Sequence, residues 1–148
     1  MFELELKNPD ELVIKDKEKV AAINIAESTI DGNLRVGKIG GAGEFEIGEI
    51  SISAKPLTDG GIMYRVVVEG VKIGLVGSTA KIEDLDELGP IDILGTTNAK
   101  FVSVVEPKVV IPMGNMDFAE VKGSVKTDKK VKVKSNALPA TLEVWKLD

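Results

Sequence analysis

The side chains of this 148-residue chain that could do chemistry are carboxylates, hydroxyls and lysines, because histidine and cysteine are both absent. Missing histidine removes the side chain used most often for proton transfer near neutral pH and for binding transition metals. Missing cysteine removes thiolate nucleophiles, disulfides and cysteine-based zinc sites. Every Ser–His or Cys–His mechanism is therefore excluded.

Three aspartates in expected loops, Asp31, Asp59 and Asp117, are the first candidates for a metal site. Their carboxylates could bind a hard cation such as Mg²⁺ or Ca²⁺. Scattered loop aspartates are commonplace, however, and the sequence contains no cluster with standard metal-ligand spacing. Solvation is therefore the default interpretation of these three side chains.

Three further stretches invite a functional interpretation. Ser78 and Thr79 follow an expected strand, but a nucleophilic serine needs an activating partner and none is apparent. The glycine-rich GKIGGAGEFE lacks the phosphate-loop pattern, so it is interpreted as a turn between two strands. The alternating lysines of KVKVK could form an anion-binding stripe, and the simpler interpretation is the solvated face of a strand.

Composition restricts the class of protein and its partners. The length fits one domain covering residues 1–148, and 43% apolar with 29% charged residues is typical of soluble globular proteins. The net charge of −5 argues against a nucleic-acid partner. No apolar window is long enough to span a membrane, and the N-terminus is too charged for a signal peptide. We therefore expect no membrane partner and a cytoplasmic location.

Short β-branched segments separated by glycine and proline turns predict a mostly β fold. Strands are expected over residues 11–15, 20–26, 33–39, 44–54, 91–94 and 108–112. A bend or bulge is expected near Gly48, and residues 62–77 predict a hairpin that turns at Glu69 and Gly70. The C-terminal segment predicts two strands joined by a turn around residues 136–139.

Helix signals are few. Ile82, Leu85 and Leu88 share one face of the stretch STAKIEDLDELG, and Gly89-Pro90 ends that helix. Residues 99–106 and 115–123 could each form a turn or two of helix. We therefore expect one or two short helices beside the strands.

Four phrases occur in a fixed order: GEFEIGEISISAKP, GIMYRVVVEGVKIGLVGS, LDELGPIDILGTTN and EPKVVIPMGN. This order resembles the metallo-β-lactamase fold superfamily, in particular its small zinc-dependent hydrolases similar to the L-ascorbate-6-phosphate lactonases. The resemblance covers about residues 20–114, and the ending LPATLEVWKLD is also similar to that of the small members. It implies a two-sheet β-sandwich of the αββα type, reduced here because the segments that would carry its helices are short.

The resemblance also assigns positions to the family's metal site. In the stretch INIAESTIDGN, Glu27 and Thr29 would stand for two histidines, Asp31 for the aspartate and Gly32 for a further histidine. A second loop corresponds to AKPLTDGG, which offers Lys55, Thr58 and Asp59. Ser78 would stand for the metal-bridging aspartate and Gly114 for the last histidine. Only Asp31 keeps the family's residue type, so the zinc that the family uses is not supported and no cofactor is expected.

Three functional hypotheses follow. The leading one is a non-catalytic protein, a pseudoenzyme that serves as a structural or interaction module and associates with itself or with another protein. The second is a hydrolase that holds a hard cation with Glu27, Asp31, Asp59 and Asp117. The third is a metal-free binder of small molecules in the old active-site cleft. That cleft would be lined by Lys55, Thr58, Ser78, Thr79 and Asn115.

Overall fold

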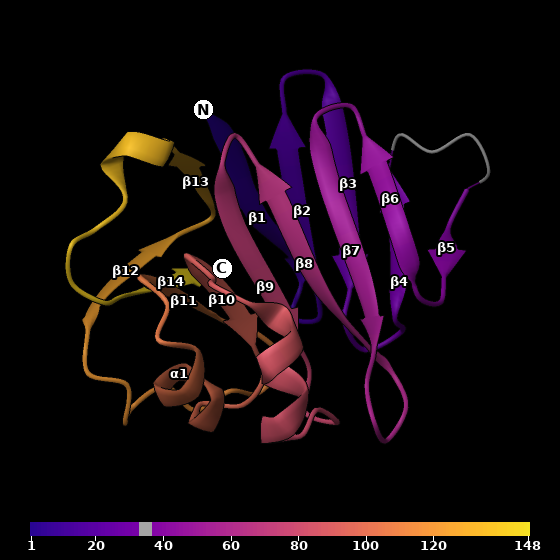
Figure 1. The fold of residues 1–148 in the computed structure, drawn as a ribbon. Helices are drawn as coiled ribbons and strands as arrows, with labels where there is room; N and C mark the ends of the chain where they lie inside the picture. The colour runs from indigo at the N-terminus through magenta and orange to yellow at the C-terminus, as the bar shows by residue number, and fades with distance from the viewer. Residues whose placement is uncertain (33–36) are drawn as a thin grey trace.

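The computed structural model describes residues 1–32 and 37–148, and it places two β-sheets face to face (Figure 1). The first sheet has the strand order β13-β1-β2-β3-β4-β5, and the second has the order β12-β14-β11-β10-β9-β8-β7-β6. The strands of the first sheet are β1 (Phe2–Asn8), β2 (Glu11–Asp16), β3 (Lys19–Asn24), β4 (Thr29–Gly32), β5 (Ile39–Gly40) and β13 (Lys130–Val133). Those of the second are β6 (Gly43–Ile47), β7 (Ile50–Pro56), β8 (Ile62–Val68), β9 (Val71–Val76), β10 (Ile93–Thr96), β11 (Val109–Pro112), β12 (Ser124–Asp128) and β14 (Glu143–Leu147).

The two sheets differ in strand direction. Every pair in the first sheet is antiparallel, as are the pairs that join β6, β7, β8 and β9. The pairs β9–β10, β10–β11, β11–β14 and β14–β12 are parallel. Parallel strands end together at one edge of a sheet, and ligands of such sheets bind beside those carboxyl ends.

Two apolar clusters hold the layers together. The larger one fills the space between the sheets and includes Ile14 and Ile23 from the first sheet with Ile52 and Ile73 from the second. The smaller cluster lies on the outer face of the second sheet, beneath the 3-10 helix η1 (Ile82–Leu88) and the α-helix α1 (Lys100–Val105). A second 3-10 turn, η2 (Ser135–Ala137), follows β13.

The outer face of the first sheet is polar, which removes the need for a covering helix. Side chains alternate across a strand, so the buried Leu4 places its neighbours Glu3 and Glu5 on the outer face. Glu3 lies opposite Lys15 and Lys132, and Glu5 lies opposite Lys130. Opposite charges in register stabilise neighbouring strands. Lys130 and Lys132 of KVKVK therefore lie opposite glutamates of β1, in agreement with the simpler interpretation of that stretch.

The expected mostly β, two-sheet sandwich with few short helices is confirmed. The hairpin of residues 62–77 is confirmed too, since Glu69 and Gly70 connect β8 to β9 with φ angles of 51° and 78°. The glycine-rich stretch is a turn, and it carries the chain from β5 in the first sheet to β6 in the second. Of the strand expected over residues 33–39, residues 33–36 lie outside the described residues.

Several expectations were wrong in detail. Gly48 is not a bulge but part of the turn between β6 and β7, and its φ of 61° suits glycine. Residues 115–123 form turns rather than a helix, and the helix expected after Ser78 is a 3-10 helix. The C-terminal segment does have strands on either side of residues 136–139, but its first strand is split into β12 and β13, and β13 and β14 belong to different sheets. Strands β1 and β4 were not predicted.

Within residues 1–32 and 37–148, we find no helix with the length and apolar character needed to cross a membrane.

Candidate functional site

A cleft of about 450 Å³ lies where strands β9 and β10 end. Residues 77–79, directly after β9, form one wall, and Thr97, directly after β10, forms another. The β7–β8 loop contributes residues 59–61, while the first sheet contributes Asp10 and residues 25, 26 and 28. The cleft therefore lies at the carboxyl ends of parallel strands, the place where such sheets generally bind ligands.

Backbone hydrogen bonds connect the segments around the cleft, and one of them joins the two sheets. The turn between β1 and β2 accepts two of them: the Gly114 amide donates to the Pro9 carbonyl at 2.8 Å, and the Ile25 amide donates to the Asp10 carbonyl at 2.9 Å. On the second sheet, the buried Thr96 hydroxyl donates to the Val76 carbonyl at 2.8 Å. These hydrogen bonds satisfy backbone groups at the strand ends and turns that surround the cleft.

The polar groups of the cleft are mostly hydroxyls. The hydroxyls belong to Ser28, Ser78, Thr79 and Thr97. The cleft also contains two carboxylates, those of Asp10 and Asp59. The Asp59 carboxylate already has a cationic partner, since it lies 3.4 Å from Lys81 Nζ. The cleft therefore offers hydrogen bonds rather than concentrated charge.

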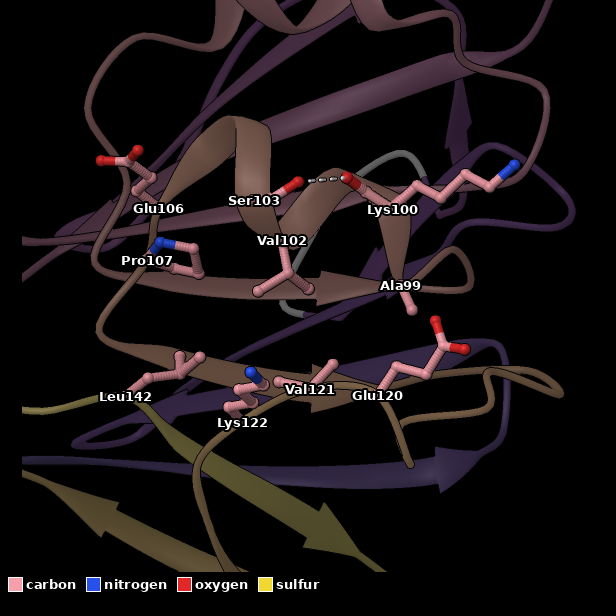
Figure 2. Close-up of a pocket in the computed structure, with 10 residues that line it drawn as sticks. All are labelled: Ala99, Lys100, Val102, Ser103, Glu106, Pro107, Glu120, Val121, Lys122 and Leu142. Atoms are coloured by element: carbon pink, nitrogen blue, oxygen red, sulfur yellow. Dashed lines mark hydrogen bonds between the residues drawn. The ribbon is translucent and has the colours of Figure 1, made fainter.

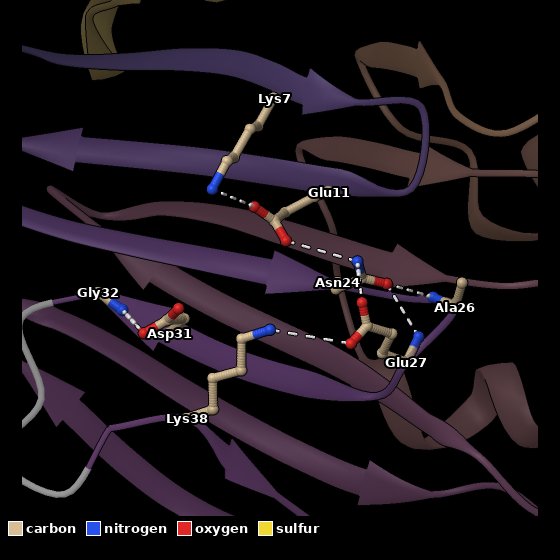
Figure 3. A network of polar contacts seen from close by, with 8 residues as sticks. All are labelled: Lys7, Glu11, Asn24, Ala26, Glu27, Asp31, Gly32 and Lys38. Atoms are coloured by element: carbon tan, nitrogen blue, oxygen red, sulfur yellow. Dashed lines mark hydrogen bonds and ion pairs between the residues drawn. The ribbon is translucent and has the colours of Figure 1, made fainter.

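Glu27, which the resemblance places at a metal ligand, belongs instead to a hydrogen-bond network in the β3–β4 turn (Figure 3). The side-chain oxygen of Asn24 accepts hydrogen bonds from the Ala26 and Glu27 amides at 3.0 and 2.8 Å. Its amide group donates to Glu11 at 3.4 Å and to Glu27 at 3.3 Å. Lys38 lies 3.9 Å from the Glu27 carboxylate. Glu27 thus stabilises a turn.

Replacing Asn24 with alanine should lower the free energy of unfolding by about 2 kcal/mol, because a buried side chain with several hydrogen bonds is removed. Asn24→Asp is the matched variant, since it keeps the acceptor for the two turn amides but places a third carboxylate beside Glu11 and Glu27. That variant should be destabilised at neutral pH and recover in mild acid. Urea unfolding at both pH values measures the effect, and an Asn24→Asp protein as stable as wild type at neutral pH would contradict this role of the amide donor.

Two other candidates, Thr58 and Lys55, line a neighbouring pocket to which η1 also contributes residues. The Thr58 hydroxyl donates to Asp84 at 2.6 Å, and the Lys81 amide donates to the same carboxylate at 2.9 Å. The hydrogen bond from Thr58 is the main reason why the pKa of Asp84 is lowered. Thr58 therefore attaches the β7–β8 loop to η1 and does not face the cleft.

The remaining candidates lie apart from the cleft. Thr29 and Asp31 pair with β3 as part of strand β4, and Asp31 accepts a hydrogen bond from the Gly32 amide. Asp117 accepts one from the Ala119 amide, and Asn115 is exposed in the turn after β11. Of the candidate residues, only Asp59, Ser78 and Thr79 come together. Among the described residues, no group of three or more carboxylates is placed to hold a metal ion, so the second hypothesis lacks its cluster.

Gly114 marks the cleft edge where the resemblance places the last histidine. Its φ of 57° lies in the left-handed region, which suits glycine. A Cβ atom on Gly114 would lie 2.9 Å from Thr97 Cγ2 and 3.5 Å from Asp10 Oδ1. A side chain at this position would therefore require Thr97 to shift.

Zinc does not fit this set of donors. Zinc sites need three or four convergent nitrogen, sulfur or carboxylate ligands. The cleft offers two carboxylates, and one of these is paired with Lys81. Hydroxyls and backbone groups do not replace the missing ligands, so no reaction step is derived through a metal.

No protein-family model and no curated protein sequence matches this chain. Among solved structures, a protein from Thermotoga maritima named a candidate Zn-dependent hydrolase of the metallo-β-lactamase superfamily is similar over 100% of both chains, with a TM-score of 0.72 and 15% identity. This chain has the metallo-β-lactamase fold. The fold implied by the sequence resemblance is therefore confirmed, in a form that has few helices.

Three residues of the cleft, Asp10, Ser28 and Thr97, were missed from the sequence. Thr97 carried an available signal, because it is a polar residue directly after the apolar strand β10. Asp10 and Ser28 lie in turns of the opposite sheet. Only the packing of the two sheets brings those turns to the cleft.

Proposed function

We propose that this protein is a non-catalytic form of the metallo-β-lactamase fold that acts by binding rather than by hydrolysis. The main support for the proposal is Gly114. The resemblance gives this position to a metal-binding histidine, but its backbone is left-handed and it is packed against Thr97. Ser78, where the resemblance expects a metal-bridging aspartate, offers only a hydroxyl. The hydrolases of this family need bound metal to form hydroxide at neutral pH, and these residues cannot hold it.

Activity and metal content test this proposal together. The full chain is produced in zinc-supplemented medium, its zinc is measured by mass spectrometry, and hydrolysis of lactone and ester substrates is followed beside a zinc hydrolase of the same fold. We expect zinc well below one ion per chain and no hydrolysis above the buffer rate. Stoichiometric zinc together with hydrolysis would overturn the proposal.

A second candidate function is binding of an uncharged, hydroxyl-rich small molecule in the cleft. The volume of about 450 Å³ lies within the usual range for ligand pockets. Four hydroxyl side chains line it, while Asp10 and Asp59 disfavour an anionic ligand. Thermal melting tests this function with a panel of free sugars and polyols against their phosphorylated forms. We expect a rise in the melting temperature only for uncharged compounds, because a ligand of the native state stabilises it. A shift only for phosphorylated compounds would contradict this assignment.

A further inference from the structure

An apolar groove lies on the outer face of the second sheet, between α1 and residues 120–122 (Figure 2). It encloses about 670 Å³. Val102, Val121 and Leu142 form its apolar lining. The groove is separate from the cleft, because the two share no lining residue.

The same outer layer carries most of the exposed apolar side chains. The described residues include four large apolar side chains that are strongly exposed, and three of them belong to this layer: Ile82 on η1, Val104 on α1 and Val125 on β12. Val125 lies opposite Val144, whereas the inward-facing Trp145 lies opposite Lys126, so Val125 is on the outer face. An apolar groove on a face that also carries exposed apolar side chains is typical of an interaction surface.

The charges at the groove are balanced and unpaired. Lys100 and Glu106 lie at the two ends of α1, and Glu120 and Lys122 lie on the opposite wall. All four side chains are exposed, and none forms an ion pair with another described residue. Because this surface carries both signs of charge, opposite charges can face one another across a two-fold contact between identical chains.

The order of the charges along α1 also favours a contact between two copies of the chain. Lys100 begins the helix and Glu106 caps its end, so each charge lies beside the helix terminus whose partial charge has the same sign. A second α1 packed antiparallel would reverse this relation. Lys100 of each copy would then face Glu106 and the carboxyl end of the other helix, with Ser103 near the axis.

We propose that the surface around α1 joins two copies of this chain, with the two α1 helices antiparallel across a two-fold axis. The exposed Val104 of each copy packs against the apolar groove of the other, and Lys100 of each copy pairs with Glu106 of its partner. This inference names the partner for the binding role proposed above and rests on that role.

Charge reversal tests the arrangement. The mass of the full chain in solution is measured by light scattering and sedimentation for wild type, Lys100→Glu and Glu106→Lys. Wild type should be a dimer, and each variant should dissociate at least tenfold more readily, because two repulsive pairs replace two attractive ones. An equimolar mixture of the two variants should form dimers again, since each Lys100→Glu, Glu106→Lys heterodimer restores both pairs. Unfolding of either variant cannot produce that recovery.

Lys134→Glu is the matched control, because Lys134 is exposed, makes no described ion pair and lies outside the groove. It should leave the dimer unchanged. Monomeric wild type at high concentration would overturn the inference, and so would a mixture of variants that stays monomeric. Neither result bears on zinc binding or hydrolysis, so failure of this inference is distinct from failure of the non-catalytic role.

Discussion

Replacing Gly114 with alanine should lower the free energy of unfolding by about 2–4 kcal/mol, which combines left-handed backbone strain with crowding of a packed site. The strain arises because φ at this position is 57°. The crowding arises because the new methyl group would lie 2.9 Å from Thr97 Cγ2. Urea unfolding followed by circular dichroism measures the loss. A histidine, being larger, should cost more than alanine.

Thr97→Ser separates the two contributions, because it removes the crowding methyl and keeps the hydroxyl. The double variant Gly114→Ala with Thr97→Ser should be more stable than the sum of the two single effects predicts, by about 1–2 kcal/mol of coupling. The strain of the left-handed backbone should remain. If the two substitutions are strictly additive, Thr97 is not what closes this position to a side chain.

Loss of stability in alkali is the second large effect that the structure predicts. Tyr64 on β8 is 1% exposed, and burial raises the pKa of its hydroxyl from 10.0 to about 12. Because the pKa is higher in the folded state, ionisation of Tyr64 costs no stability while the pH stays below 10.0, the value for the exposed group. The free energy of unfolding then falls as the pH rises toward 12. Two pKa units correspond to about 2–3 kcal/mol for a fully buried group.

Tyr64→Phe isolates this effect because phenylalanine does not titrate. The Tyr64 hydroxyl has no hydrogen-bond partner among the described residues. At neutral pH the free energy of unfolding of the variant should therefore equal that of wild type or exceed it by about 1 kcal/mol. Above pH 10 the difference should widen in favour of the variant. Urea unfolding over this range measures it, and tyrosinate absorbance reports on Tyr64 alone because the chain has one tyrosine. Parallel pH profiles would contradict the prediction.

The parts of the fold that the sequence predicted are those with strong local signals. Continuous apolar runs predicted β10 and β11, and a two-residue turn predicted the β8–β9 hairpin. The separation of β12 from β13 could not be found in this way, because all five residues of β12 are exposed and only Val125 is large and apolar. Strand β1 alternates Phe2, Leu4 and Leu6 with polar residues, so its pattern was present but overlooked among the charges.

Only the part of the candidate site around the end of β9 was predicted from the sequence. Ser78 and Thr79 directly follow β9, and the β7–β8 loop brings Asp59 to them. Glu27 and Thr58 were assigned by counting along the chain, yet their side chains bind Asn24 and Asp84 respectively. Such partners lie in other turns or elements, so spacing in sequence does not reveal them. The crowding at Gly114 likewise depends on Thr97, a residue from the preceding strand end.

Zinc calorimetry on the purified full chain tests the central claim most directly. The cleft holds two carboxylates, one of them paired with Lys81, and Gly114 supplies no side-chain ligand. The account predicts no saturable heat of binding at neutral pH. Saturable binding of one zinc ion per chain, lost in an Asp59→Asn variant, would show a working metal site in the cleft and contradict it.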